Sequence, residues 1–403
     1  MDAIAPQEWF LKVVEIAAAL SPGRAGARRE SPAPGRVLLR AGIEGLEVFG
    51  DNQEVWARLP VRGARVVSTG ACVVDGIALG KILSEWDDGA EIMLGVADGW
   101  LELTGGAQAW RIRAEPMSGW KPMPPISYEP GTMVPLSALA ALDKHIRFAV
   151  GEGPYRPFAH VQMEVRPDLL IALAADGGKL AIAHIPLPES SDADIESKNV
   201  LLSSQTVVTL GRLAAVGSAH TVEGGIGVET GYATLVVDGS KVGWLMDSGE
   251  LVVRQASGIP MDYHAILGQG KRGVTRFQAT ICDLRRAAKA LTAVAGDEGR
   301  ISIQAGAGAA LVMKAESAGQ VQGEISVQAI ASGPISTVEC DAGSLWECLE
   351  HFSGEEAEGV LGGQGRQLYL RSTAPSFRGD YAVLLATAKA GGAAMVSPDI
   401  TTE

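Results

Sequence analysis

Three stretches share one pattern of strand, glycine turn and strand: GAEIMLGVADGWLELTGG at residues 89–106, EGGIGVETGYATLVVDGS at 223–240 and GVLGGQGRQLYLRS at 359–372. Glycine suits the turn of a hairpin because it reaches a positive φ without a steric penalty. The turn glycines Gly99, Gly231 and Gly365 are 132 (231 − 99) and 134 (365 − 231) positions apart. The sequence therefore predicts three copies of one unit. The alternative is that glycine-rich hairpins recur by chance.

Each copy also contains two segments in which apolar residues recur at helical spacing. Those that open the copies are 9–20, 136–150 and 282–296, and those that precede the hairpins are 77–86, 207–216 and 344–352. Between them lie short β-runs such as 45–50, 169–175 and 300–306. We expect an α+β fold of three repeated domains, each with two helices and antiparallel sheets. The predicted boundaries are 1–128, 129–269 and 270–388, followed by a flexible tail at 389–403.

The composition narrows the class of protein. The chain has 403 residues, of which 47% are hydrophobic and 20% charged, so it is a globular protein of several domains. No basic stretch followed by an apolar run opens the sequence, and no apolar run has the length of a membrane span. We expect a cytoplasmic protein with no membrane contact. The four cysteines form no C-x-x-C pair and indicate buried thiols rather than a disulfide scaffold or a metal site.

The net charge of −13 argues against a protein that is coated all over with nucleic acid. It leaves one arrangement open, in which basic residues gather on a single surface of an acidic molecule. The sequence also gives little support for catalysis. Residues 268–273, GQGKRG, match G-x-G-x-x-G, but β-rich residues follow, so we interpret them as an interdomain loop rather than a dinucleotide site.

Four short strings carry a resemblance to a known family. Asp176-Gly-Gly-Lys-Leu-Ala resembles a central Asp-Gly-His-Arg-Leu-Ala string, and Gly89-Ala-Glu-Ile matches a tetrapeptide after a helix. Ile259-Pro-Met-Asp-Tyr and Tyr381-Ala-Val-Leu-Leu resemble two later strings. In this order, the strings resemble those of the bacterial DNA polymerase III β subunit, the sliding clamp. The resemblance implies a non-enzymatic processivity factor without cofactor or metal. Two three-domain crescents would close into a ring, with helices lining a hole for duplex DNA.

The resemblance requires basic residues on the helices that line the hole. The residues expected to contact DNA are Lys12, Lys81, Lys144, Arg147, Arg212, Arg285, Arg286 and Lys289 on helices, and Arg24 and Arg156 in loops. Their contacts would be to the phosphate backbone and independent of sequence. A solvated helix face is the alternative. The segment 344–352 fits poorly, because it has no Lys or Arg.

Similar clamps bind polymerases and the clamp loader through a short peptide of glutamine and apolar residues. The resemblance implies a groove formed by Ala175, Gly177, Lys179, Leu180, Pro260, Ile266, Val383 and Leu384. Plain core packing is an equal alternative for Leu180, Ile266 and Val383. The usual Met-Pro-Met-Arg-Leu ending is absent, and Ala386-Thr-Ala-Lys stands in its place.

The resemblance also implies a homodimer, with Trp110 and Ile112 of one subunit meeting Val294 of the other. An intradomain core position is the alternative for Trp110. The predicted function is a clamp that encircles double-stranded DNA at the nucleoid and tethers the replicative polymerase. A clamp-like paralogue that serves as a scaffold or competitor without productive loading is a second hypothesis, and an unrelated β-rich enzyme is a third.

Overall fold

In a computed structural model, the structure describes residues 1–20, 35–151, 158–188, 197–218, 231–296, 299–317, 321–362, 367–374, 377 and 379–386. The chain divides into two compact units. Unit 1 comprises Met1–Ala140 and Gln205–Gln255, and unit 2 comprises Ala141–Ser204 and Ala256–Glu403. Residues 129–269, predicted as one domain, contribute strands to both units. The three-domain boundaries therefore stay a prediction.

Unit 1 contains two antiparallel sheets. The first has the order β5 (Arg65–Ser68), β1 (Asp2–Pro6), β7 (Glu91–Ala97), β8 (Trp100–Gly105) and β9 (Gln108–Arg113). The second has the order β10 (Thr132–Pro135), β15 (Tyr232–Asp238), β16 (Lys241–Met246), β17 (Gly249–Arg254), β4 (Val55–Pro60), β3 (Gly45–Asp51), β2 (Arg36–Gly42) and β6 (Gly70–Asp75). The β17–β4 pair joins segments almost two hundred positions apart into one sheet.

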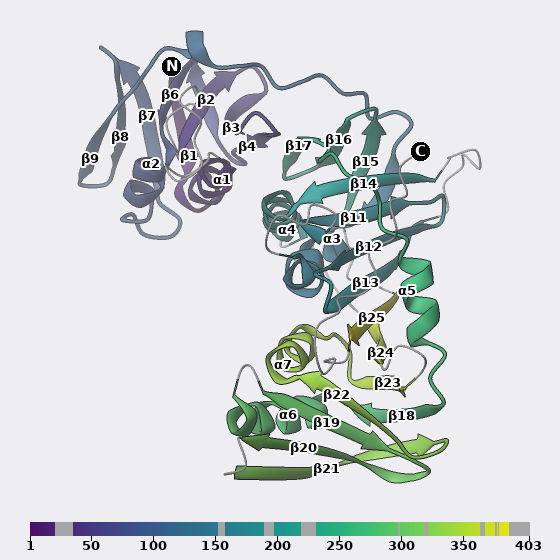
Figure 1. Ribbon diagram of the computed structural model, residues 1–403. Coiled ribbons are helices and arrows are strands. Elements are labelled where there is room, and N and C mark those ends of the chain that lie inside the picture. Colours follow the sequence, from purple (N-terminus) through teal and green to yellow (C-terminus); the bar gives the residue numbers. More distant parts are fainter. Residues whose placement is uncertain are drawn as a thin grey trace. The chain divides into compact units, whose positions relative to one another are not determined.

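The helices α1 (Gln7–Leu20) and α2 (Gly76–Leu83) pack against each other in unit 1 (Figure 1). The α1 helix also lies close against β3, since a Cβ on Gly50 would stand 2.5 Å from the carbonyl oxygen of Ala17. At the N-terminus of α2, the Asp75 carboxylate accepts a hydrogen bond from the Ala78 amide at 3.0 Å, which satisfies one of the free helix donors. In the helix α4 (Ser204–Ser218), every residue after Ser204 also belongs to this unit.

Unit 2 is built on one twelve-stranded antiparallel sheet. Its order is β14 (Lys198–Ser203), β11 (His160–Val165), β12 (Leu169–Ala175), β13 (Lys179–Pro186), β25 (Gly379–Ala386), β24 (Gln367–Ala374), β23 (Glu356–Leu361), β18 (Thr275–Thr280), β21 (Val321–Ser332), β20 (Gly308–Ser317), β19 (Arg300–Ala305) and β22 (Ser336–Asp341). The β13–β25 pair sets Leu180 opposite Leu384.

The two faces of this sheet bury different helices. The helices α6 (Ile281–Ala295) and α7 (Ala342–His351) pack against each other, α6 against β18–β21 and α7 against β22 and β25 (Figure 1). On the opposite face, α5 (Tyr263–Gly270) contacts β24 and contributes Tyr263 and Leu267 to a buried cluster. Side chains alternate along a strand, so each strand supplies one row to each face.

The predicted α+β class with antiparallel sheets is confirmed. The six predicted helices are confirmed as α1, α2, α4, α6, α7 and α3 (Leu136–His145), which ends shortly before the 3₁₀ turn η2 (Arg147–Ala149). A second 3₁₀ turn, η1, spans Met117–Gly119. No helix among the described residues is long and apolar enough to cross a membrane.

The repeated hairpins are partly described. The β7–β8 hairpin turns at Asp98 and Gly99, whose φ angles of 51° and 76° lie in the left-handed region, as a two-residue turn requires. The β23–β24 hairpin is also present, but its turn glycine, Gly365, lies outside the described residues. Gly231 directly precedes β15, and the strand predicted before it lies outside them too.

Two details of the sequence interpretation are corrected. Residues 268–270 lie at the end of α5 rather than in a loop, because burial of Tyr263 and Leu267, one helical turn apart, stabilises a helix despite the glycines. The strand β18 follows, so the strand–turn–helix order of a dinucleotide motif is absent there. Cys72, Cys340 and Cys348 are buried as expected, whereas Cys282 is exposed on α6.

Candidate functional site

The cations expected to face DNA in unit 1 lie on the surfaces of three helices. Lys12 on α1 forms an ion pair with Glu8 at 2.6 Å, and its ammonium stands 5.8 Å from the centre of the Trp9 ring. Lys81, in the last turn of α2, and Arg212 on α4 are exposed. Neither forms a salt bridge or hydrogen bond with any residue that the structure describes. Lys81 and Arg212 are therefore available for a phosphate.

At the end of α3, two cations have different surroundings. Lys144 is exposed and has no salt bridge or hydrogen bond within the described ranges. Arg147, in η2, forms an ion pair with Asp143 one helical turn earlier. An exposed pair of this kind contributes little to stability, so Arg147 can exchange the carboxylate for a phosphate at small cost.

The α6 helix separates a buried face from a charged one. Leu284, Ala287, Ala288 and Leu291 are buried, while Arg286 and Lys289 are exposed on the other side. The Arg286 guanidinium lies 3.4 Å from Asp283 with its side chain 77% exposed. The Lys289 ammonium stands 5.7 Å from the Trp346 ring centre of α7. Two cations one turn apart thus form a basic edge on this acidic chain.

Arg285 has a different environment from Arg286. It donates hydrogen bonds to the carbonyl oxygens of Leu349 at 2.6 Å and of Glu350 at 3.4 Å, and another to Phe352. The last carbonyls of a helix lack partners within that helix, and a cation there is favourable. Arg285 therefore fastens α6 to the end of α7. The other two predicted DNA contacts, Arg24 and Arg156, lie outside the described residues.

Part of the predicted partner groove comes together on the α5 side of unit 2. Ala175, Leu180 and Leu384 belong to one buried cluster, and Ile266 of α5 packs against it. The β12–β13 and β13–β25 pairings create this proximity, because Ala175 lies opposite Leu180 and Leu180 opposite Leu384. Ala175, Leu180 and Leu384 are themselves covered, as the core-packing alternative expects for Leu180, and of these four only Ile266 leaves apolar surface accessible to a peptide.

Two further predicted groove residues are accessible. Gly177 turns the chain between β12 and β13 with φ = 91°, and no atom lies within 4 Å of where its Cβ would be. Pro260 is exposed just before α5. The next residue, Met261, is held to β11 because its amide donates to the Gln162 side-chain oxygen at 2.7 Å. This hydrogen bond fixes the segment that leads into α5.

Lys179 and Val383 lie on the other face of the sheet. The Lys179 ammonium forms ion pairs with Glu347 of α7 at 2.5 Å and with Asp176 at 3.0 Å. Burial disfavours the charged form of Lys179, but the hydrogen bond to Glu347 and the charge of Asp176 outweigh it and raise its pKa. Lys179 therefore neutralises one of the two acids of α7, and Val383 is core on the α7 side.

The fold of this chain is similar to that of several solved bacterial proteins. A sliding clamp of Pseudomonas aeruginosa bound to griselimycin is 17% identical, with a TM-score of 0.80 over 96% of this chain and 99% of its own. DNA polymerase III β subunit from Thermotoga maritima, 17% identical, and a sliding clamp from Bacillus subtilis, 14% identical, each give a TM-score of 0.80 over 97% of this chain and 100% of their own. No family model and no curated protein matches the chain.

The chain has the sliding-clamp fold. The resemblance that the four short strings suggested is thereby confirmed at the level of fold, even though fewer than one residue in five is identical to these clamps. Such low identity explains why only short strings were recognisable in the sequence.

The predicted seam residues of the clamp lie on an edge strand and a helix. Trp110 is 42% exposed on β9, the edge strand of its sheet, which does not fit an intradomain core position. Ile112 points to the same face of β9 but is buried. Val294, near the end of α6, is half-buried and close to Gly323 on β21. The dimer contact itself stays a prediction.

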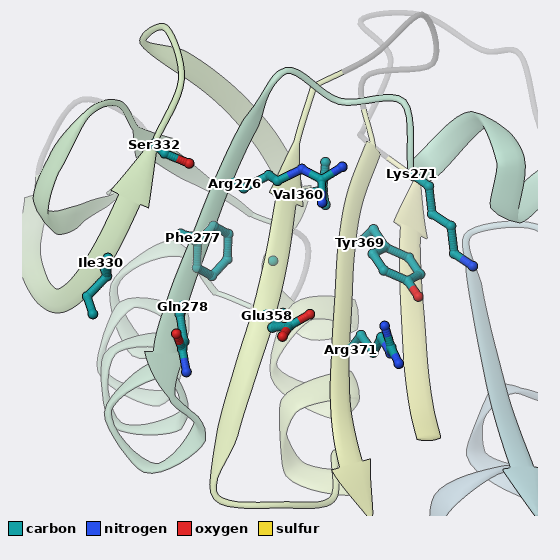
Figure 2. A pocket seen from close by; sticks show the side chains of 11 residues that line it. Lys271, Arg276, Phe277, Gln278, Ile330, Ser332, Glu358, Val360, Tyr369 and Arg371 are labelled. Atoms are coloured by element: carbon teal, nitrogen blue, oxygen red, sulfur yellow. The ribbon is translucent and has the colours of Figure 1, made fainter. Parts of the chain in front are cut away.

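One feature of unit 2 was missed in the sequence. A hollow of about 440 Å³ lies on unit 2, with Lys271, Arg276, Glu358 and Arg371 around it (Figure 2). On β18 the exposed Arg276 and Gln278 alternate with buried residues, a pattern that any solvated strand face also gives. Only the pairing of distant strands shows that these charges converge. Among the described residues, no group of three or more His, Cys, Asp or Glu could hold a metal ion.

Proposed function

We propose that this protein is a sliding clamp: two copies form a ring around duplex DNA and tether the replicative DNA polymerase. The observation that carries the proposal is the match of almost the whole chain to almost the whole length of several bacterial clamps. In this proposal the protein has no catalytic site. It works through topology, and any polymerase activity belongs to its partners.

The exposed cations on the helices support the DNA-facing part of the proposal. Five cations are exposed and, among the described residues, have no ion pair except the one between Arg286 and Asp283: Lys81, Lys144, Arg212, Arg286 and Lys289. Phosphate contacts from such side chains carry no sequence information and are screened by salt. Weak contacts are sufficient, because a closed ring cannot leave the duplex sideways. The clamp would therefore move along DNA of any sequence, in the cytoplasm and at the nucleoid.

The partly buried Ile266, which packs against the buried cluster of Leu180 and Leu384, supports the partner-binding part. In this proposal, polymerase and clamp loader each present a short peptide of glutamine and apolar residues to the predicted groove. The segment after Ala386 differs from the usual clamp ending, which favours one alternative: a paralogue that binds replication proteins but is not loaded onto DNA.

A loading experiment tests the proposal. The protein is incubated with a nicked circular plasmid, ATP and the clamp loader of the same organism, and the DNA-bound fraction is isolated by gel filtration. A clamp stays on the circle and is lost after a restriction enzyme linearises it. Loss from intact circles at the same rate would contradict encirclement. Binding of the loader without retention on any circle would favour the paralogue.

A further inference from the structure

The hollow on unit 2 lies on the same sheet face as Leu180 and Leu384 of the predicted partner groove. Strand pairing sets Leu180 opposite Leu384, Leu384 opposite Tyr369, Tyr369 opposite Val360 and Val360 opposite Arg276. This single row of cross-strand neighbours leads from the predicted groove into the hollow. A smaller hollow of about 200 Å³ shares Lys271, Tyr369 and Arg371 with the first. Both hollows therefore lie on the face that carries the predicted groove, over β25, β24, β23 and β18.

The next row of this face carries charge. Ala382 lies opposite Arg371, Arg371 opposite Glu358 and Glu358 opposite Gln278. Figure 2 shows Arg276, Glu358 and Arg371 on three neighbouring strands around the hollow. Together with Lys271, the lining has more positive than negative groups, although the chain as a whole has a net charge of −13.

Two of these cations form no ion pair with the described residues. Arg276 forms no salt bridge or hydrogen bond with the described part of the chain, and Lys271 has only the Tyr369 ring, 5.8 Å from its ammonium. Arg371 is paired with Asp380 at 2.6 Å. In the smaller hollow, Nδ1 of His184 is buried without a hydrogen-bond partner among the described residues. The hollow thus offers unused donors beside an aromatic ring.

We propose that this hollow binds an acidic stretch of the partner peptide, next to the peptide residues that would bind at the predicted groove beside Ile266. The inference rests on the proposed function and adds the chemistry of its partner. Arg276 presents a planar set of donors to a carboxylate, and Lys271 adds a second cation. One or two peptide carboxylates match the small positive excess of this lining, whereas a nucleic acid would bring a phosphate with every nucleotide close to Glu358 and Asp380.

Labelled peptides provide the test. All share a core of glutamine, leucine and phenylalanine, and they carry three glutamates, three glycines or three lysines at either end. We expect one of the two glutamate peptides to bind the full-length protein about fivefold more tightly than its glycine counterpart, as two partly exposed charge pairs would give. The lysine peptide with the same arrangement should bind more weakly than the glycine one. Raised salt should reduce these differences.

A double variant and a matched control locate the effect. Arg276→Gln with Lys271→Gln should remove the advantage of glutamate and leave the affinity for the glycine peptide unchanged. Arg272→Gln removes a neighbouring exposed arginine that does not line the hollow and should keep the advantage. Equal binding of glutamate and glycine peptides, or an advantage that survives the double variant, would overturn the inference while the clamp function stands.

Two other results would also decide against it. Displacement of the glutamate peptide by short single-stranded DNA, with that DNA bound through Arg276 and Lys271, would make the hollow a nucleic-acid site. If no core peptide binds at all, the peptide-binding part of the proposed function fails, and the inference fails with it.

Discussion

The two faces of the unit 2 sheet are made by the same strands and differ in kind. Along β25, Tyr381, Val383 and Leu385 point toward the α7 side, where Tyr381 packs against Phe352 and its hydroxyl donates to the His145 carbonyl at 2.6 Å. Ala382 and Leu384 point to the α5 side, where a buried apolar cluster lies beside an open, charged hollow. Because successive side chains of a strand point to opposite faces, one strand can contribute to the core on one face and to a binding site on the other.

A substitution on the α7 side of the sheet, which is packed as core, should have the largest effect on stability. Tyr381 is fully buried, so Tyr381→Ala leaves a cavity and an unpaired carbonyl and should lower the free energy of unfolding by about 4 kcal/mol. Tyr381→Phe keeps the ring and should cost only about 1 kcal/mol. Urea unfolding followed by circular dichroism measures both. Equal losses in the two variants would show that ring burial is not what matters there.

The adjacent residues Arg285 and Arg286 on α6 allow the same comparison between a packed and an exposed side chain. Arg285→Gln should lower the free energy of unfolding by about 2 kcal/mol, because α7 loses hydrogen bonds to its terminal carbonyls. Arg286→Gln should change it by less than about 0.5 kcal/mol.

DNA binding should show the opposite order for these arginines. Arg286→Gln combined with Lys289→Gln should reduce the salt dependence of binding to a linear duplex, lowering the slope of log K against log salt by up to about 1.8. Arg285→Gln should leave the slope unchanged. Fluorescence anisotropy over a salt series measures it, and a slope that moves only with Arg285 would refute this assignment of the two side chains.

Peptide binding distinguishes the two faces directly. Ile266→Ala trims a partly buried side chain that packs against the cluster of Leu180 and Leu384, and it should weaken binding of the glycine-flanked core peptide about tenfold. Val383→Ala, on the opposite face, should leave the dissociation constant unchanged once the folded fraction is taken into account. Isothermal titration calorimetry at one temperature compares them. Equal weakening by both would mean that the peptide does not bind on the α5 side.

The smallest expected effect is on the pH dependence of stability. Burial lowers the pKa of two histidines from 6.5: His145, which packs against Tyr381 on the α7 side of the sheet, and His184, which lines the smaller hollow. Below pH 6.5 the unfolded chain binds protons that the folded chain still excludes, so the free energy of unfolding should fall as the pH drops from 6.5 through these lowered values. His184→Gln should reduce the decline measured by urea unfolding. A stability that rises on acidification in this range would contradict the burial of neutral imidazoles.

Local patterns in the sequence were sufficient for six helices and for the β7–β8 and β23–β24 hairpins, but not for α5. The spacing of Leu284, Ala287, Ala288 and Leu291 predicts α6, and the glycine at 99 predicts the β7–β8 turn. The pairing of β13 with β25 could not be predicted, because it depends on a contact between segments two hundred positions apart. Both Lys179 and Leu180 were therefore assigned to the partner groove from the sequence. In the structure the two side chains point to opposite faces of the sheet, as adjacent residues of a strand do. The sequence also contained no sign that Arg285 binds α7.

The central claim is that two copies of this chain close into a ring with cationic helices toward a central opening. Cryo-electron microscopy of the purified protein, with its mass measured by light scattering in the same buffer, tests it most directly. We predict a mass twice the 41.9 kDa of one chain and a closed ring wide enough for duplex DNA. A particle of 41.9 kDa, or a dimer without a central opening, would contradict it.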